Sequence, residues 1–193
     1  MKKFAFIILI LSGVTACDNS TRNGQDAAQL TAYTTKGDSI VKITFDTLRN
    51  ALVKTMGEKG LAGALRFCNV QALPITALYA SNDISISRVT NKNRNPENEL
   101  SAFDKIQWEK YEALPAKKDS LKPVVVPNNN EIHYYKPIIM QGMCLSCHGT
   151  AEKEIPKELL PVIDSLYPSD KAKGYKAGDL RGMWHLEFTK RNK

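Results

Sequence analysis

The chain has 193 residues, of which 42% are hydrophobic and 24% are charged, and its formal net charge is +7 at pH 7. This length suits one domain with a hydrophobic core. The basic residues are scattered apart from a small group near the end, Lys190, Arg191 and Lys193. No nucleic-acid-binding module accompanies them, so we expect no nucleic-acid partner but a solvated surface with some affinity for acidic groups.

The N-terminus predicts export. Lys2 and Lys3 precede an unbroken apolar run over residues 4–11, and small residues then lead to Cys17 in Val14-Thr-Ala-Cys17, the pattern of a bacterial lipoprotein signal. The run is far shorter than the roughly 20 residues that a membrane-spanning helix needs. We therefore expect residues 1–16 to be removed and Cys17 to carry lipid, anchoring the chain on the periplasmic side of a bacterial membrane.

Residues 17–36 are polar and rich in Asn, Thr and Gln, which predicts a flexible tether ahead of a folded domain over residues 37–193. Apolar residues at helical spacing then predict helices over residues 39–59 and 61–79. Gly57 and Gly60 interrupt this pattern, and Pro74 should kink the second helix or end its first half. Cys68 falls on the apolar face of that second helix.

Strands and further helices follow in alternation. Strands are expected over residues 83–90, 124–126, 132–139 and 180–188, with a turn at residues 128–130. Helices are expected over residues 95–112, capped by Asn95, and 152–166. Because the strands are separated by short turns, we predict an α+β fold: an antiparallel sheet flanked by helices in a single domain.

The clearest chemical motif is Cys144-Leu-Ser-Cys147-His148, the C-x-x-C-H attachment signature of a c-type haem. Two thiols at this spacing can each form a thioether with a haem vinyl group, and His148 then lies where it can bind the iron. Export supports this interpretation, because haem is attached to such motifs outside the cytoplasm. The expected cofactor is one covalent haem c.

Two other interpretations of the motif stay open. One is a zinc site, for which Cys68 would supply a fourth ligand, and the other is a thiol redox pair, which lacks the usual βαβ context. Cys68 is the one cysteine of four without an assigned use. In an oxidising compartment it is either an inert buried thiol or a second iron ligand. The competing ligands are His133, His185, Met56, Met140, Met143 and Met183.

Five motifs in order resemble a family of exported c-type haem-binding domains with a PAS-like fold, which includes a cyanobacterial protein with Cys/His-ligated haem. The likeness spans roughly residues 40–189 and implies a PAS-like antiparallel sheet with haem held against it. It also implies that Cys68 binds the iron opposite His148. The residues at Met183-Trp-His185 depart from the family pattern. The matching stretches are Ala64-Leu-Arg-Phe-Cys68 with Leu73-Pro-Ile75, and residues 88–98, 144–149, 167–175 and 178–182.

Three arginines, Arg88, Arg94 and Arg181, lie within these stretches. Guanidinium groups pair well with carboxylates, so we expect them to reach the haem propionates unless they are ordinary surface residues.

The sequence as a whole predicts a lipid-anchored monohaem protein, not an enzyme, that transfers electrons or senses redox state or a small gas. We expect it to act with a separate redox or signalling protein. One alternative is a peroxidase-type enzyme, which would need an open iron position and His133 or His185 as distal acid/base. The other is a zinc-binding structural module.

Overall fold

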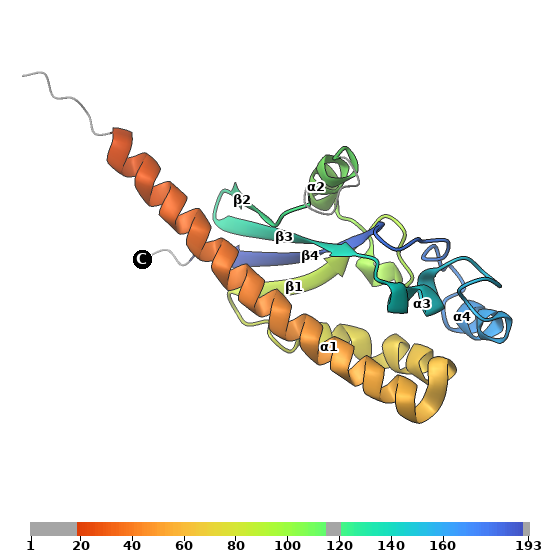
Figure 1. The fold of residues 1–193 in the computed structure, drawn as a ribbon. Coiled ribbons are helices and arrows are strands. Elements are labelled where there is room, and N and C mark those ends of the chain that lie inside the picture. Colours follow the sequence, from red (N-terminus) through yellow and green to blue (C-terminus); the bar gives the residue numbers. More distant parts are fainter. Residues whose placement is uncertain (1–18, 115–120, 191–193) are drawn as a thin grey trace, which may run out of the picture.

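The computed structural model describes residues 19–114 and 121–190, so Cys17 and the predicted signal peptide lie outside the described residues. Its centre is a four-stranded sheet in the order β1-β4-β3-β2, with all neighbouring strands antiparallel. Together with the helices packed on it, the sheet confirms the predicted α+β fold (Figure 1). The strands are β1 (Ile84–Val89), β2 (Val124–Asn128), β3 (Glu131–Ile139) and β4 (Leu180–Thr189).

The sheet is buried on both faces, and side chains alternate between the faces along each strand. Trp184, Leu186 and Phe188 of β4 pack with Val41 of helix α1 (Asn19–Ala77) on one face. Met183 packs on the opposite face, in the cluster that includes Trp108 of helix α2 (Ala102–Glu112). Alternate residues of β4 therefore pack in two different hydrophobic clusters, one on each face of the sheet.

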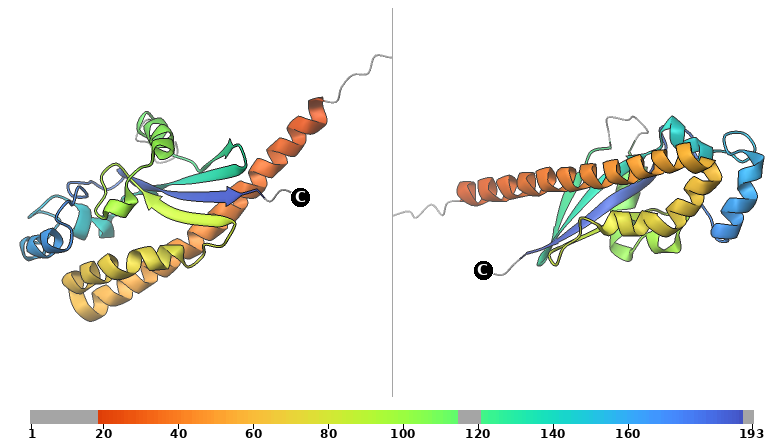
Figure 2. Two further views of the ribbon diagram at one scale, coloured as in Figure 1. Left: turned by 180° about the vertical axis from the view of Figure 1, so that it is seen from behind. Right: turned by 90° about the horizontal axis from the view of Figure 1, so that it is seen from below.

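Helix α1 is a hairpin of two helical halves. Gly60 has φ 64° and ψ −174°, a conformation that is essentially restricted to glycine, and the chain reverses there. The second half runs back beside the first (Figures 1 and 2). The two predicted helices are thus present with the break at Gly60, whereas Gly57 stays helical and Pro74 does not end the second half.

Residues 19–36 are helical, so our expectation of a flexible tether over this range was wrong. The segment has one glycine and no proline, and Thr31, Thr34 and Thr35 donate their hydroxyls to carbonyls one turn back. Tyr33 also packs on Phe188 of the sheet, with ring centroids 5.2 Å apart. The folded unit therefore begins before residue 37. No described helix is both long enough and apolar enough to cross a membrane.

Two predicted helices are each shorter than expected. The first is divided into a 3-10 turn, η1 (Pro96–Asn98), capped by Asn95, and α2, which Ser101 and Asp104 begin with a reciprocal capping box. Ile106 of α2 is exposed. The second comprises only η3 (Lys157–Leu159) and α4 (Leu160–Leu166), because Pro156 caps the start and lacks the N–H that a helix running through it would require.

Candidate functional site

A cavity of about 220 Å³ lies between the α1 hairpin, the end of the sheet and the C-x-x-C-H segment. Both halves of α1 supply its apolar wall. A second cavity of about 180 Å³ adjoins it and shares Cys144, His148, Arg88 and Arg181 with it. The apolar lining of the first cavity comprises Leu48, Leu52, Met56, Ala64, Leu65, Ala72 and Leu73.

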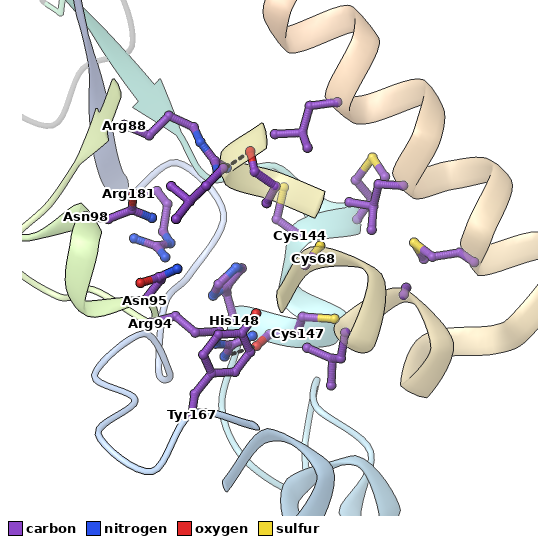
Figure 3. Close-up of a pocket in the computed structure, with 18 residues that line it drawn as sticks. Cys68, Arg88, Arg94, Asn95, Asn98, Cys144, Cys147, His148, Tyr167 and Arg181 are labelled. Carbon is purple, nitrogen blue, oxygen red and sulfur yellow. Dashed lines mark hydrogen bonds between the residues drawn. The ribbon is translucent and has the colours of Figure 1, made fainter. Parts of the chain in front are cut away.

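The C-x-x-C-H segment enters this cavity on two short helical turns, η2 (Gly142–Cys144) and α3 (Leu145–His148). Cys144, Cys147 and His148 all line the cavity, and Figure 3 shows them gathered beside Cys68. Cys68 comes from the returning half of α1, so the fold brings together four residues that the sequence separates by up to 80 positions. Every predicted site residue within the described chain borders this space.

His148 is prepared to bind a metal ion. Its Nδ1 lies 2.9 Å from the carbonyl oxygen of Ala172, which can only accept a hydrogen bond, so Nδ1 carries the hydrogen and Nε2 keeps its lone pair. Burial, reinforced by the charges of Arg181 and Arg94, holds the pKa of His148 well below its usual range. The imidazole is therefore neutral, which is the form that coordinates metals.

Cys68, in contrast, is not in the form that binds metal ions. Burial raises the pKa of its thiol, and the nearby Arg88 guanidinium offsets this only in part. The thiol is therefore protonated at neutral pH unless a cation binds it. A metal ion would reverse this preference, because metal ions stabilise the thiolate.

The four residues Cys68, Cys144, Cys147 and His148 are not arranged as a zinc site. Among the described residues, the only His/Cys/Asp/Glu group with ligand atoms within 4.8 Å of one another is His133, His185 and Glu187. The zinc interpretation of the C-x-x-C-H segment required four converging ligands. The cavity instead keeps the ligand atoms apart around an open space.

Arg88 and Arg181 give the cavity a positively charged rim. Arg88 Nη2 donates a long hydrogen bond of 3.4 Å to the carbonyl of Ala72, but its buried Nε has no hydrogen-bond partner among the described residues. Burial lowers the pKa of Arg88 to about 10 and also lowers that of Arg181. Two desolvated guanidinium groups at one cavity form a binding site for carboxylates.

Arg94 has an additional role, because two of its nitrogens already bond within the protein. Its Nε and Nη2 bond Asp170 Oδ1 and Oδ2, each at 3.1 Å, and Nη2 also donates to the carbonyl of Cys147 at 2.7 Å. The Asp170 side chain is almost fully buried. Arg94 thus fastens the C-x-x-C-H segment to the loop around residue 170, and its contact with a propionate stays a prediction.

The alternative ligands are divided by the sheet. His133, His185 and Met183 lie on the α2 face and do not line either cavity. Of the histidines that the structure describes, only His148 lines these cavities, so neither His133 nor His185 lies where a peroxidase would need its distal acid/base. Met56 and Met143 line the first cavity and Met140 the second.

The family model of the Tll0287-like proteins matches residues 15–188. The chain belongs to the Tll0287-like family. The fold of this Tll0287-like chain is similar to the crystal structure of the cyanobacterial heme-protein Tll0287, with a TM-score of 0.58 and 23% identity over 82% of this chain and 98% of that one. No curated protein matches the chain. The family predicted from the sequence motifs is confirmed.

Sequence reasoning missed several residues at the Tll0287-like site. Tyr167, Asn95 and Asn98 line the first cavity, and all three fall inside stretches already noted for the family likeness, which was the available signal. The carbonyl of Ala172 orients His148, but a main-chain contact leaves no mark on side-chain identity. Leu48 and Leu52 were assigned to a helix face without any sign that this face borders a cavity.

Proposed function

We propose that this protein binds one haem c in the cavity, attached through Cys144 and Cys147, with His148 and Cys68 as the two axial ligands of the iron. The observation that carries the proposal is His148: a neutral imidazole with a free Nε2 at a cavity that also holds both motif thiols and Cys68. Tll0287, whose fold this chain resembles, is titled a heme-protein.

The residues around the cavity fit the parts of a haem. The α1 hairpin offers leucines and a methionine to the apolar macrocycle. The unpartnered Nε of Arg88 and the guanidinium of Arg181 offer charge-assisted hydrogen bonds to propionates. Arg94 holds the C-x-x-C-H segment in place through the carbonyl of Cys147. When bound, haem supplies one-electron redox chemistry at its iron.

Electron transfer or redox and gas sensing is the activity that this ligand set supports best. A thiolate from Cys68 favours the ferric state and a low potential, and two filled axial positions leave no open position for peroxidase chemistry. We further propose that lipid on Cys17 holds the protein on the periplasmic side of a bacterial membrane, where it meets a separate redox or signalling protein. The signal-like N-terminus supports this location.

The test is to produce the full chain together with a haem-attachment system and to extract it with acid–acetone. The wild type should keep its Soret absorption, because thioether bonds survive conditions that break coordination. Cys144→Ala with Cys147→Ala should give a colourless or extractable product. A wild-type protein that shows no Soret band would refute the proposal.

A further inference from the structure

A second cluster of potential ligands lies on the α2 face of the sheet, away from the cavity. Its members are His133 on β3 and His185 and Glu187 on β4, with ligand atoms within 4.8 Å of one another. His133 pairs with Glu187 across the two central strands, and His185 is the next β4 residue on the same face. The three side chains therefore come from the two central strands of the sheet, and the proposed haem site uses none of them.

Asp104 of α2 fixes the orientation of His185. Its Oδ1 lies 3.0 Å from His185 Nδ1 and also accepts the hydroxyl of Tyr135 at 2.9 Å, while Ser101 donates to its Oδ2. An ionised carboxylate can only accept, so His185 carries its hydrogen on Nδ1 and keeps a lone pair on Nε2.

His133 is held by His185 rather than by a carboxylate. Its Nδ1 lies 2.9 Å from His185 Nε2, the distance of a hydrogen bond, and because His185 Nε2 keeps its lone pair, His133 Nδ1 donates to it in the metal-free protein. The Nε2 of His133 is buried without a hydrogen-bond partner among the described residues and lies 3.4 Å from Glu131 Oε2. A hydrogen that moved from Nδ1 to Nε2 would therefore lie beside a carboxylate and free Nδ1 to bind a cation.

A cation can replace the hydrogen between the two nitrogens, because both point to one spot and a carboxylate lies beside it. Glu187 Oε2 is 4.0 Å from His133 Nδ1 and about a third exposed, so it can turn toward the same centre. Two further carboxylates, Asp104 and Glu131, lie behind the imidazoles. Two neutral imidazoles among three carboxylates form a donor set that suits a divalent cation.

We propose that His133 Nδ1, His185 Nε2 and Glu187 bind a divalent transition-metal ion of the zinc class, with Asp104 and Glu131 orienting the two imidazoles. Two imidazoles and one carboxylate leave a fourth position for water on the exposed side of Glu187. A carboxylate behind each ligating histidine is the usual second layer of such sites. Tetrahedral Zn–N bonds of about 2.05 Å separate two nitrogens by about 3.3 Å, so the pair opens by roughly 0.4 Å on binding.

The experiment uses the untagged, haem-loaded full chain, dialysed against micromolar Zn²⁺ and then against buffer. The zinc content per chain is measured by mass spectrometry, and the protein concentration by amino-acid analysis. Neither measurement uses the haem absorption, so a failure of haem loading is detected separately. We expect one zinc per chain. His133→Gln with His185→Gln should abolish binding, and Asp104→Asn should weaken it by about 10- to 100-fold. Glu109→Gln, an exposed carboxylate on α2, is the matched control and should keep the zinc.

X-ray absorption at the zinc edge identifies the ligands. Imidazole scattering with nitrogen and oxygen neighbours is expected, whereas sulfur neighbours would place the ion on the cysteines and overturn the proposal. Wild-type protein without zinc, or a double-histidine variant that keeps it, would also overturn it. If the double variant fails to fold, Glu187→Gln decides alone, because it leaves both imidazoles in place: weakened zinc binding is expected, and unchanged affinity contradicts the site.

Discussion

His148 and Cys68 line the same cavity but differ in whether they must lose a proton before they bind a metal ion. His148 is neutral with a free lone pair, so it can bind a metal ion without losing a proton. Cys68 has to lose one, and burial opposes that step. In the proposed haem site the thiolate would therefore depend on the charge of ferric iron, and reduction would weaken the interaction that keeps Cys68 ionised.

We expect Cys68→Ala to change the ligation and the midpoint potential of the haem iron while leaving the rest of the site intact. The ferric haem should become high-spin or visibly different in ligation, and its midpoint potential should rise, because an anionic ligand that favours ferric iron has been removed. Electron paramagnetic resonance and a redox titration measure both effects. Met56→Leu, which changes another sulfur-bearing residue of the same cavity, is the control and should leave them unchanged. A wild-type spectrum and potential in Cys68→Ala would return Cys68 to the role of an inert thiol.

Substitutions at two cavity arginines should have different effects, one on the stability of the protein and the other on the midpoint potential of the haem. Arg94→Met takes the bidentate partner from the buried carboxylate of Asp170 and leaves it only the Ala172 amide and the Lys173 ammonium at 3.9 Å. This loss should cost about 3–5 kcal/mol in the free energy of unfolding. Arg88→Met removes a cation that has no carboxylate partner among the described residues, so the stability of the haem-free protein should change little. In the haem-loaded protein the midpoint potential should fall, since a nearby cation favours the ferrous haem. Chemical denaturation and potentiometry test the pair. Equal losses of stability in the two variants would contradict this division of roles.

At the scale of elements, the α1 hairpin forms the cavity because it reverses at one residue. Gly60 adopts a backbone conformation closed to other residues, while a Cβ at Gly60 or at Gly57 would meet nothing within 4 Å. Any cost of substitution at Gly60 is therefore a cost of backbone conformation and not of packing.

Gly60→Ala should reduce the free energy of unfolding by about 1–3 kcal/mol, because alanine is strained at φ 64°, ψ −174°. Gly57→Ala is the matched control: it lies within the helix and should be neutral or stabilising by about 0.4–1 kcal/mol. Urea denaturation followed by circular dichroism measures both. If the two variants lose the same stability, strain at the turn is not the cause.

The elements also show where sequence patterns suffice. The Gly60 break and the Asn95 cap were predictable because each depends on one residue's own backbone preference. The helix over residues 19–36 was not, because polar composition suggested a tether while Tyr33 gains its packing from Phe188 on a distant strand. The pairing of Arg94 with Asp170 was hidden for the same reason, since it joins positions far apart in the chain.

For the whole molecule, the antiparallel α+β sheet followed from alternating strands and short turns, but the division of functions between its two faces did not. One step along β4 decides whether a side chain joins Trp184 on the α1 face or His185 on the α2 face. Sequence alternation reveals this parity but not which interior holds which site. His133 and His185 could therefore be considered as iron ligands until the faces were known.

Three buried tyrosines make the whole fold sensitive to alkali. Burial raises the pKa of Tyr111, Tyr134 and Tyr135 above the value of about 10 in an unfolded chain. Their contribution to stability is fully present below about pH 10 and is lost as pH rises further, because the unfolded chain releases protons that the native one retains. The free energy of unfolding, measured in urea across this range, should fall by up to about 1.4 kcal/mol per pH unit for each tyrosine.

Tyr111→Phe tests the origin of this slope. It removes one ionising group and the hydroxyl that donates to the carbonyl of Lys122 at 2.9 Å. We expect lower stability at neutral pH, by about 0.5–1.5 kcal/mol, and a shallower fall above pH 10. A variant with an unchanged alkaline slope would assign the loss of stability to other groups.

The loop that orients His148 also sets an order of events in time. Gly174 and Tyr175 donate their amides to the carbonyls of Gly149 and His148, and Ala172 holds the imidazole. These residues are synthesised after the C-x-x-C-H segment, so the segment leaves the ribosome before the chain that will fasten it exists. Folding, once complete, half-buries both thiols beside the α1 hairpin. A covalent cofactor would thus be attached during the interval between translocation and closure, and the speed of that closure would limit how long the attachment machinery has to act.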